Sequence, residues 1–543
     1  MVCNCSYILF FSATGKKISA FLPVRQFQEG RYVVFATKNS TAKKTGLMAY
    51  ANPRRSGIIA ISLGEGDEVV GVRCVRLLFG CWVVVQVALA FSWLARQIHG
   101  AGSSETKMEP SARTVIIGAG VGGLAAGYFL QQAGREVEIY ERAAVPGGRI
   151  QLLEKDGARI DVGAQYFHTN YVETYKLLDA LGLKDKLLPI RPPVQMIRNG
   201  RGYLVKHNTL RYRMIPLISN LKFARIFWTT YRNFSRIDPY YNDPLEEFEN
   251  VELSDYILRK CDREALEFLV RPLITAFNLS DPEGESLAHF LRITKQFLTS
   301  SDACLATGMF TFPEMLSRGL PVTYNADVRQ IQTQSNRVTG VQALVGKEMR
   351  QIEASNVILA TPLKELIPLL PVLTDEEKST ISDYKYSQLP LVVFFMKRRL
   401  AESHWAYVFS RTESFKASFT SDAAFKCAAM VPSGKSVLQV WFAGAAGEAL
   451  VDEAEDKIVQ LAREEMKRVI PDFDALVESV DVVRHHTGMS RYKVGIYPRL
   501  RDFLKSISRV KGLYIVGDCY GHSTLETAVR SARRAADALL RPA

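Results

Sequence analysis

The feature that most constrains this chain is the stretch from Thr114 to Glu141, TVIIGAGVGGLAAGYFLQQAGREVEIYE. A short apolar run leads into a glycine-rich turn, a segment of small and apolar residues, and a second apolar run that ends in an acid. This order predicts a strand, a helix and a parallel strand. The expected fold class is therefore α/β, with a Rossmann-like dinucleotide-binding domain.

The glycines of the turn have separate roles. Gly118 permits the tight turn, Gly120 lets a diphosphate approach the backbone, and Gly123 lets the helix pack closely on the strand. The amides at the start of that helix favour an anionic diphosphate. The residues of the turn that we expect to contact a cofactor are Gly118, Ala119, Gly120, Gly122 and Gly123.

Glu141 stands 21 residues after Gly120 and is placed to accept hydrogen bonds from an adenosine ribose. Up to this residue the stretch is compatible with a nicotinamide site, a flavin site or a purely structural turn. The continuation, ERAAVPGGRI, adds Arg142, a second glycine pair that includes Gly148, and Arg149. The glycines can bring a second loop against the cofactor, and Arg149 can place its charge near the diphosphate or form a surface salt bridge.

This continuation resembles the superfamily of flavin-containing amine oxidases, protoporphyrinogen oxidases and phytoene desaturases, in which the fingerprint is followed by a GGR segment. The sequence DVGAQYF, residues 161–167, is similar to the DxGxxxF pattern of that superfamily. The resemblance implies that the cofactor is FAD and that Gly163 and Ala164 lie near its isoalloxazine ring.

Two further blocks extend the resemblance over residues 112–543. In the first, GMFTFPEMLSRGLPVTYNADVRQIQ, the backbone of Val328 is expected to hold the adenine side of FAD. In the second, GLYIVGDCYGHSTLETAVRSARRAADALL, the resemblance places Asp518 near the ribityl and phosphate groups, beside Gly517 and before a helix that starts at about Leu525. The alternative for Gly517 and Asp518 is an ordinary helix cap.

Together these blocks imply a discontinuous FAD-binding domain and an α+β substrate domain. The expected FAD-binding segments are 112–190, 316–371 and 480–543. The expected substrate-domain segments are 191–315 and 372–479.

Departures from the superfamily pattern narrow the expected reaction. The stretch SQLPLVVFFM lacks the lysine of amine oxidases, and Cys519 is better explained as a packed residue than as a covalent flavin link, so FAD should be bound non-covalently. We expect transfer of a hydride from a small lipophilic substrate to the flavin N5, as in the protoporphyrinogen oxidases and desaturases; a flavin amine oxidase is the alternative. Candidate residues beside the flavin are Tyr166, Tyr520 and His522, the last of which could titrate near neutral pH.

The segment NLKFARIFWTTYRNF, residues 220–234, carries aromatic residues at helical spacing with cations beside them. It predicts either an interfacial membrane contact or a helix that faces the core with a solvated basic face.

The first 73 residues show short β-branched runs separated by turn signals, which predicts a short β-rich appendage. This region resembles part of the DNA-wrapping C-terminal domain of DNA gyrase A, about one blade of a repeat architecture. A single blade lacks the neighbours that bury its apolar face. The segment is therefore either a fusion remnant, natural or introduced by the gene model, or a basic DNA-binding appendage; nucleic acid is not the expected partner.

Residues 74–111 contain the apolar run LLFGCWVVVQVALAFSWLA, residues 77–95, and a polar linker. The run has the length of a membrane span, but an interfacial segment or a junction artefact explains it equally well. The eight cysteines form no CxxC pair, so no disulfide framework or metal site is expected, and a reducing compartment follows. We expect a cytoplasmic protein with membrane association through residues 77–95, and the oligomeric state stays open.

Overall fold

A computed structural model of the chain divides into two compact units, Met1–Met108 and Glu109–Ala543. The structure describes residues 6–11, 18–24, 31–37, 42–50, 69–76, 113–190, 194–205, 211–400 and 405–541. The expected apolar segment 77–95 and the linker after it lie outside these residues. No helix among the described residues is both long and apolar enough to cross a bilayer.

The described residues of the first unit form antiparallel strands and a short 3-10 helix, Leu47–Tyr50. β1 (Ser6–Phe11) pairs with β2 (Ile18–Val24). A second sheet has the order β4-β3-β5, with β3 (Arg31–Thr37) between β4 (Ala42–Gly46) and β5 (Val69–Arg76). The run YVVFAT therefore forms a strand as predicted, whereas GIIAIS lies outside the described residues.

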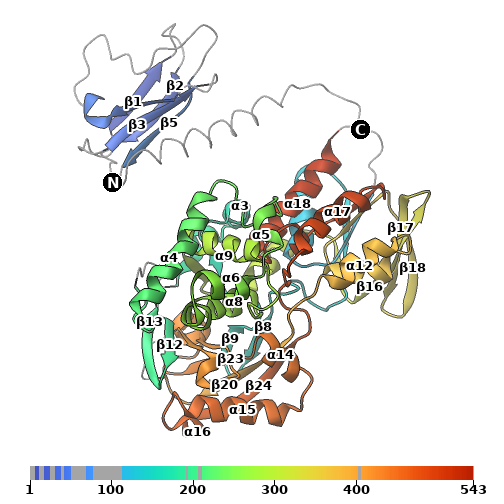
Figure 1. Cartoon of the computed structure of the whole chain (residues 1–543). Helices are drawn as coiled ribbons and strands as arrows, with labels where there is room; N and C mark the ends of the chain where they lie inside the picture. Colours follow the sequence, from blue (N-terminus) through green and yellow to red (C-terminus); the bar gives the residue numbers. More distant parts are fainter. Residues whose placement is uncertain are drawn as a thin grey trace. The chain divides into compact units, whose positions relative to one another are not determined.

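The second unit (Figure 1) contains the parallel sheet that the fingerprint predicts. Its strand order is β15-β7-β6-β19-β25, and its ladders are parallel. The strands are β6 (Thr114–Ile117), β7 (Val137–Tyr140), β15 (Val322–Thr323), β19 (Asn356–Leu359) and β25 (Leu513–Ile515). Distant parts of the sequence thus share one sheet, as the motif blocks imply.

Two helices pack together beside this sheet. α2 (Val121–Gln132) follows β6, and the C-terminal helix α18 (Leu525–Leu540) lies against α2. The buried carboxylate of Glu526 in α18 accepts hydrogen bonds from three backbone amides at the start of α3 (Val172–Ala180). The last helix of the chain therefore completes the capping of an early one.

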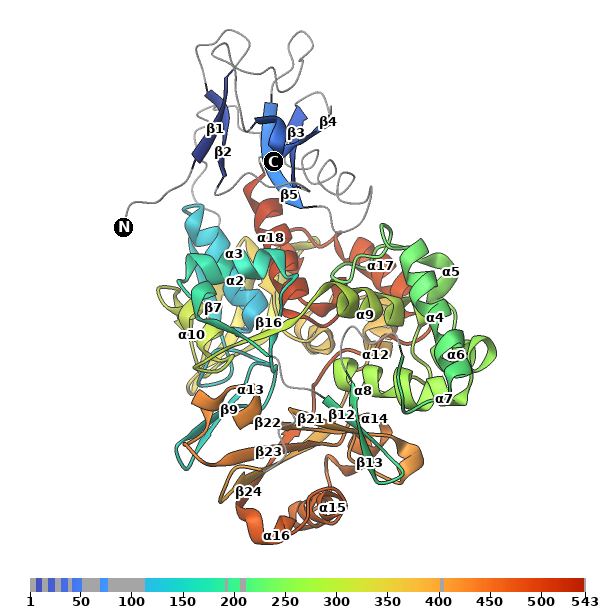
Figure 2. The ribbon, with the colours of Figure 1, turned by 90° about the vertical axis from the view of Figure 1, so that its left-hand side faces the viewer.

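The unit also contains a mixed sheet of seven strands, with the order β13-β12-β21-β22-β23-β20-β24. Its strands are β12 (Val194–Arg198), β13 (Arg201–Val205), β20 (Leu389–Met396), β21 (Ala406–Phe409), β22 (Phe419–Asp422), β23 (Ser436–Trp441) and β24 (Val477–His485). Figure 2 shows α15 (Glu455–Lys467) covering the outer face of this sheet. The other face packs on the hairpin of β8 (Leu152–Lys155) and β9 (Ala158–Asp161).

Helices between β13 and β14 (Asp302–Leu305) gather at one side of the unit (Figure 2). They include α4 (Leu217–Arg232), α6 (Leu253–Lys260), α8 (Arg271–Asn278) and α9 (Leu287–Thr299). A three-stranded antiparallel sheet packs against the parallel sheet and consists of β16 (Ala326–Gln334), β17 (Arg337–Val345) and β18 (Glu348–Glu353).

Some of the domain boundaries expected from the sequence fall between sheets, and one falls inside a sheet. Every strand of the parallel sheet lies within the segments expected for the FAD-binding domain. The boundary at residue 480, however, falls inside β24 (Val477–His485), a strand of the seven-stranded sheet. The hairpin β8–β9, expected in the FAD-binding domain, packs in the core of that same sheet.

Candidate flavin and substrate site

A cavity of about 940 Å³ runs from the fingerprint turn to the seven-stranded sheet and the helices beside it. One section is lined by the glycine turn, Glu141, Arg149, Val328 and Asp518. The other section is lined mainly by aromatic and aliphatic side chains: Met196, Met214, Phe223, Phe227, Phe268, Leu269, Leu273, Phe277, Phe297, Trp405, Val408, Phe419 and Trp441. The first section is polar and the second apolar, so two different ligands can meet where they join.

The glycine turn leaves space where a side chain would project. An added Cβ at Gly120 would meet no atom within 4 Å, so the open space there belongs to the cavity. An added Cβ at Gly123 would lie 2.0 Å from the carbonyl oxygen of Gly118, which itself has a φ of +101°. The tight turn at Gly118 and the close packing at Gly123 are present, and the open space at Gly120 leaves room for the diphosphate expected there.

Glu141 follows β7 and points back at the turn. Its Oε2 accepts a hydrogen bond of 2.6 Å from the Ala119 amide, and its Oε1 accepts one of 2.8 Å from the Ala143 amide. A carboxylate has about four acceptor positions, so these two bonds leave capacity for the hydroxyls of a ribose. Glu141 therefore fixes the turn and can bind a ligand at the same time.

Glu141→Ala should weaken the retention of FAD by roughly one to two orders of magnitude. The reason is that hydrogen bonds to a charged carboxylate contribute about 1.5–3 kcal/mol each. The measurement is bound flavin per protein after exhaustive dialysis, followed by titration. Glu138→Ala is the control, because Glu138 pairs with Arg113 at the surface and does not line the cavity. Unchanged affinity in Glu141→Ala would contradict the ribose assignment.

Arg149 and Asp518 are brought together from opposite ends of the unit. The Arg149 Nη1 lies 2.7 Å from the Asp518 Oδ2 and donates a bond of 3.0 Å to the carbonyl oxygen of Gly488. Burial raises the pKa of the Asp518 carboxyl, but Arg149 and the hydroxyls of Ser490 and Ser523 together hold that pKa below its usual value. Both residues line the cavity, so a fixed ion pair faces the polar section.

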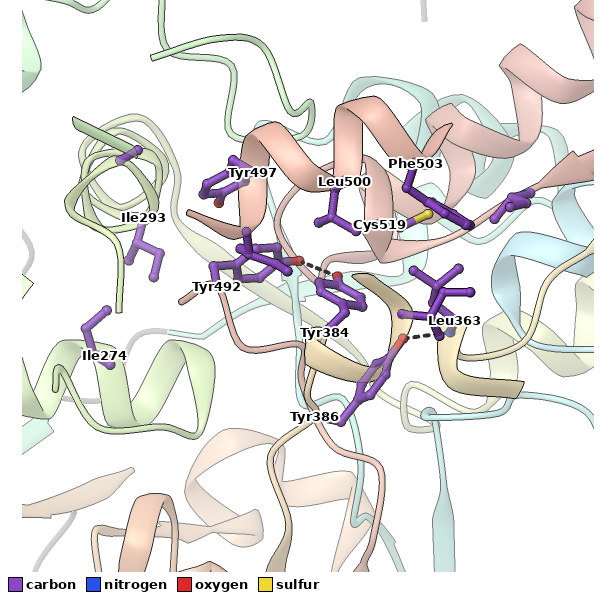
Figure 3. Close-up of a cluster of buried hydrophobic side chains, with 14 of the residues drawn as sticks. Ile274, Ile293, Leu363, Tyr384, Tyr386, Tyr492, Tyr497, Leu500, Phe503 and Cys519 are labelled. Atoms are coloured by element: carbon purple, nitrogen blue, oxygen red, sulfur yellow. Dashed lines mark hydrogen bonds between the residues drawn. The ribbon is translucent and has the colours of Figure 1, made fainter. Parts of the chain in front are cut away.

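Two tyrosines hold the backbone of the loop that contains Asp518, and Figure 3 shows these tyrosines together with Cys519 of that loop. The hydroxyls of Tyr384 and Tyr492 donate to the Asp518 carbonyl oxygen at 3.0 and 3.2 Å, and they lie 3.4 Å from each other. The cap of α18 is Thr524, whose side chain accepts a bond from the Thr527 amide. Asp518 is therefore not the cap of that helix, although Gly517 is the N-cap of the short 3-10 helix Asp518–Tyr520.

Further residues expected at the cofactor line the same cavity, and they are Gly122, Arg142, Gly148, Gly163, Ala164, Val328 and Gly517, whereas Ala119 and Gly123 do not line it. The Ala164 amide donates to the carbonyl oxygen of Arg149, and an added Cβ at Gly163 would lie 2.1 Å from that same oxygen. Val328 lies on β16, an edge strand, so one side of its backbone is not used by the sheet. Arg142 forms a long ion pair of 3.8 Å with Glu365.

The three candidates beside the flavin have different outcomes. Tyr166 and His522 line the cavity, whereas Tyr520 does not. Burial lowers the pKa of His522 to about 3, and its Nδ1 lies 3.0 Å from the Gln296 Oε1. The expectation that His522 titrates near neutral pH is therefore wrong, because a fully buried imidazole resists taking up a charge.

Sequence reasoning missed His168 and Asp302, which form a buried pair in the cavity wall. They are register partners on β10 (Phe167–His168) and β14, with 3.0 Å between the His168 Nδ1 and the Asp302 Oδ1. The His168 ring packs parallel to Phe277 and edge-on to Tyr166. The only signal in the sequence is that His168 directly follows DVGAQYF; nothing local identifies Asp302.

A second missed pair lies beneath the loop of Gly163 and Ala164. The Lys426 Nζ donates to the Asp161 Oδ2 at 2.6 Å and to the Gln165 Oε1 at 3.2 Å. The Gln165 side chain in turn donates to the carbonyl oxygens of Asp161 and Gly163. This buried charge pair, together with Gln165, therefore fixes the loop of Gly163 and Ala164.

These observations fit a bound FAD. The open space at Gly120, the two acceptors at Glu141 and the ion pair at Asp518 suit a diphosphate, a ribose and a ribityl chain in turn. The fold and this site define an FAD-dependent oxidoreductase.

Residues 121–540 match the family model for flavin containing amine oxidoreductases, and the chain belongs to this family. Coproporphyrinogen III oxidase of Bacillus subtilis (strain 168) is 23% identical over 456 residues, which cover 74% of this chain and 92% of the relative. The mitochondrial protoporphyrinogen oxidase of Nicotiana tabacum is 27% identical over 194 residues, which cover 34% of this chain and 36% of the relative.

Solved structures share the fold of the second unit. Cyclohexylamine oxidase of Brevibacterium oxydans IH-35A superposes with a TM-score of 0.63 at 16% identity, covering 79% of this chain and 99% of the other. A fatty acid isomerase from P. acnes superposes with a TM-score of 0.62 at 17% identity, covering 80% of this chain and all of the other.

The first unit has a different relationship. Residues 31–76 match the model of the DNA gyrase C-terminal domain, a β-propeller. DNA gyrase A of Aeromonas salmonicida is 52% identical over 58 residues, which cover 11% of this chain and 6% of the relative. The resemblance seen in the sequence is confirmed, and the matched piece is a small fraction of the gyrase protein.

Proposed function

We propose that this enzyme dehydrogenates a lipophilic substrate at a C–H bond, in the manner of protoporphyrinogen oxidases and desaturases. The observation that carries the proposal is the apolar section of the cavity. Of the charged residues in that section, Asp302 pairs with His168, and the Arg484 Nη2 donates to the carbonyl oxygen of Glu453. Burial of an apolar molecule is favourable there, and Arg484, whose bonds go to uncharged backbone carbonyls, can pair with an acidic group at the edge of such a substrate.

Bound FAD supplies the hydride acceptor at its N5. Dehydrogenation also releases a proton, and His168 is placed to take it. Asp302 and the Ser300 hydroxyl occupy the side of the His168 Nδ1, which leaves Nε2 as the nitrogen toward the cavity. The hydride and the proton leave adjacent atoms of the substrate, and a double bond forms between those atoms.

A flavin amine oxidase is the second candidate. The aromatic rings of Phe419 and Trp441 stack with 5.5 Å between centroids, and Trp441 stacks on His485 at 6.3 Å. Aromatic faces attract an ammonium group. The carboxylate of Asp302 lies in the same cavity, although His168 already pairs with it.

Anaerobic bleaching of the flavin band of the purified protein tests the proposal. Coproporphyrinogen, protoporphyrinogen and a carotenoid precursor are compared with putrescine and cyclohexylamine. We expect a lipophilic donor to bleach the band, and His168→Asn should slow the bleaching roughly 100- to 10,000-fold while retaining FAD. Bleaching by amines alone would favour the second candidate, and no bleaching by any donor would refute both.

A further inference from the structure

The outer face of α4 carries a stripe of large apolar side chains. Leu217, Ile218, Leu221, Trp228 and Tyr231 are each between 54 and 61% exposed. Leu217, Leu221, Trp228 and Tyr231 follow a helical spacing of three, four and seven residues, so they share one side of the helix. The rings of Trp228 and Tyr231 stack with 5.8 Å between their centroids. Surface residues of this size are normally scattered singly, so a continuous stripe marks an interaction surface.

Cations border this stripe, and α4 itself contains no acidic residue. Arg225 lies between Leu221 and Trp228 along the sequence and is exposed, as is Arg232 at the end of the helix. The third cation of the helix, Lys222, lies 3.3 Å from Asp262. The surface therefore combines apolar side chains, an aromatic pair and uncompensated positive charge.

The opposite side of the same helix faces the interior. Phe223 and Ile226 are buried, and Phe223 and Phe227 line the apolar section of the cavity. The sequence offered an interfacial contact or a core-facing helix as alternatives for this segment. The structure shows a helix with a buried face and, on its other side, an exposed apolar and basic face.

We propose that α4 docks on an anionic phospholipid membrane, with its apolar stripe inserted at the level of the headgroups. An amphipathic helix with Trp and Leu on one side and Arg beside them has the composition that binds such a surface. A second copy of the chain is disfavoured because its α4 would bring the same positive charges. Docking goes beyond the proposed function, and it would place the wall of the substrate cavity next to the lipid phase.

The test is co-sedimentation of the full-length FAD-bound protein with vesicles. One set contains phosphatidylcholine alone and the other phosphatidylcholine with phosphatidylglycerol. We expect binding to the anionic set that falls as salt rises. The double variant Leu221→Glu/Trp228→Glu should bind roughly 100-fold more weakly, and Arg225→Gln/Arg232→Gln roughly 10-fold more weakly on the anionic set only.

Met349→Glu is the matched control, because Met349 is 58% exposed and lies on strand β18 rather than on α4. Flavin content and thermal unfolding of each variant establish that it is folded. The chain has five tryptophans, so insertion of Trp228 is measured as the quenching by brominated lipid that is lost in Trp228→Phe. Binding that is equal in Leu221→Glu/Trp228→Glu and Met349→Glu would overturn the proposal and assign attachment to another segment. Absence of vesicle binding by the unmodified protein would also overturn it, as would a stripe-dependent dimer in solution.

Discussion

Gly120→Ala should abolish FAD retention without lowering the free energy of unfolding. Gly123→Ala should lower both FAD retention and the free energy of unfolding. Gly120 has a φ of −68° that alanine adopts readily, and its added Cβ would meet no protein atom within 4 Å. That Cβ would occupy the space through which a diphosphate approaches the backbone. The Cβ of Gly123→Ala would lie 2.0 Å from the Gly118 carbonyl oxygen and would push α2 away from β6.

Overpacking of this kind costs about 1–3 kcal/mol. The measurements are flavin content after dialysis and chemical unfolding of the flavin-free proteins, since bound FAD would itself add stability. Flavin-free Gly120→Ala should unfold at the same denaturant concentration as the unmodified protein, and Gly123→Ala should unfold at a lower concentration. Full FAD occupancy in Gly120→Ala would contradict the assignment of this turn to the diphosphate.

Lys426→Met should lower the free energy of unfolding by about 3–5 kcal/mol, because it leaves the Asp161 carboxylate buried without its partner. The two side chains are 2 and 0% exposed. Loss of the lysine also frees Gln165, so FAD should bind more weakly as the loop of Gly163 relaxes.

The control is Lys435→Met, which removes an exposed ion pair of 2.6 Å with Glu478 and should change stability by less than about 1 kcal/mol. The double variant Asp161→Asn/Lys426→Met should recover part of the loss, since no uncompensated charge remains. Chemical unfolding of the flavin-free proteins measures the stability of all three variants, and flavin content after dialysis measures their binding of FAD. A Lys426→Met protein as stable as the Lys435→Met protein would show that Asp161 does not depend on the lysine.

The parts of the site that follow from the sequence are those whose determinants are local. The turn from Gly118 to Gly123 and the acid at Glu141 lie within one βαβ unit, and glycine requirements of that kind are visible in the residues themselves. Arg149 and Asp518 were each expected at the cofactor, but their ion pair joins residues from the two ends of the unit.

The parts that the sequence does not reveal depend on contacts between distant segments. His168 meets Asp302 because β10 pairs with β14, and Lys426 reaches Asp161 across 265 positions of the chain. No local pattern specifies such partners. His522 shows that a residue type can also mislead. Histidine commonly titrates near neutral pH, but burial in this fold lowers the pKa of His522 to about 3.

The interleaving of the parallel sheet has a consequence for biosynthesis. The edge strand β25, the Asp518 carboxylate and the Glu526 cap of α3 all come from the final segment of the chain, whereas β6 and β7 are made early. Chains emerge from the ribosome N-terminus first, so the glycine turn must wait for residues 513–526 before its site is whole. Binding of the cofactor during synthesis is therefore delayed until that distant segment has been made.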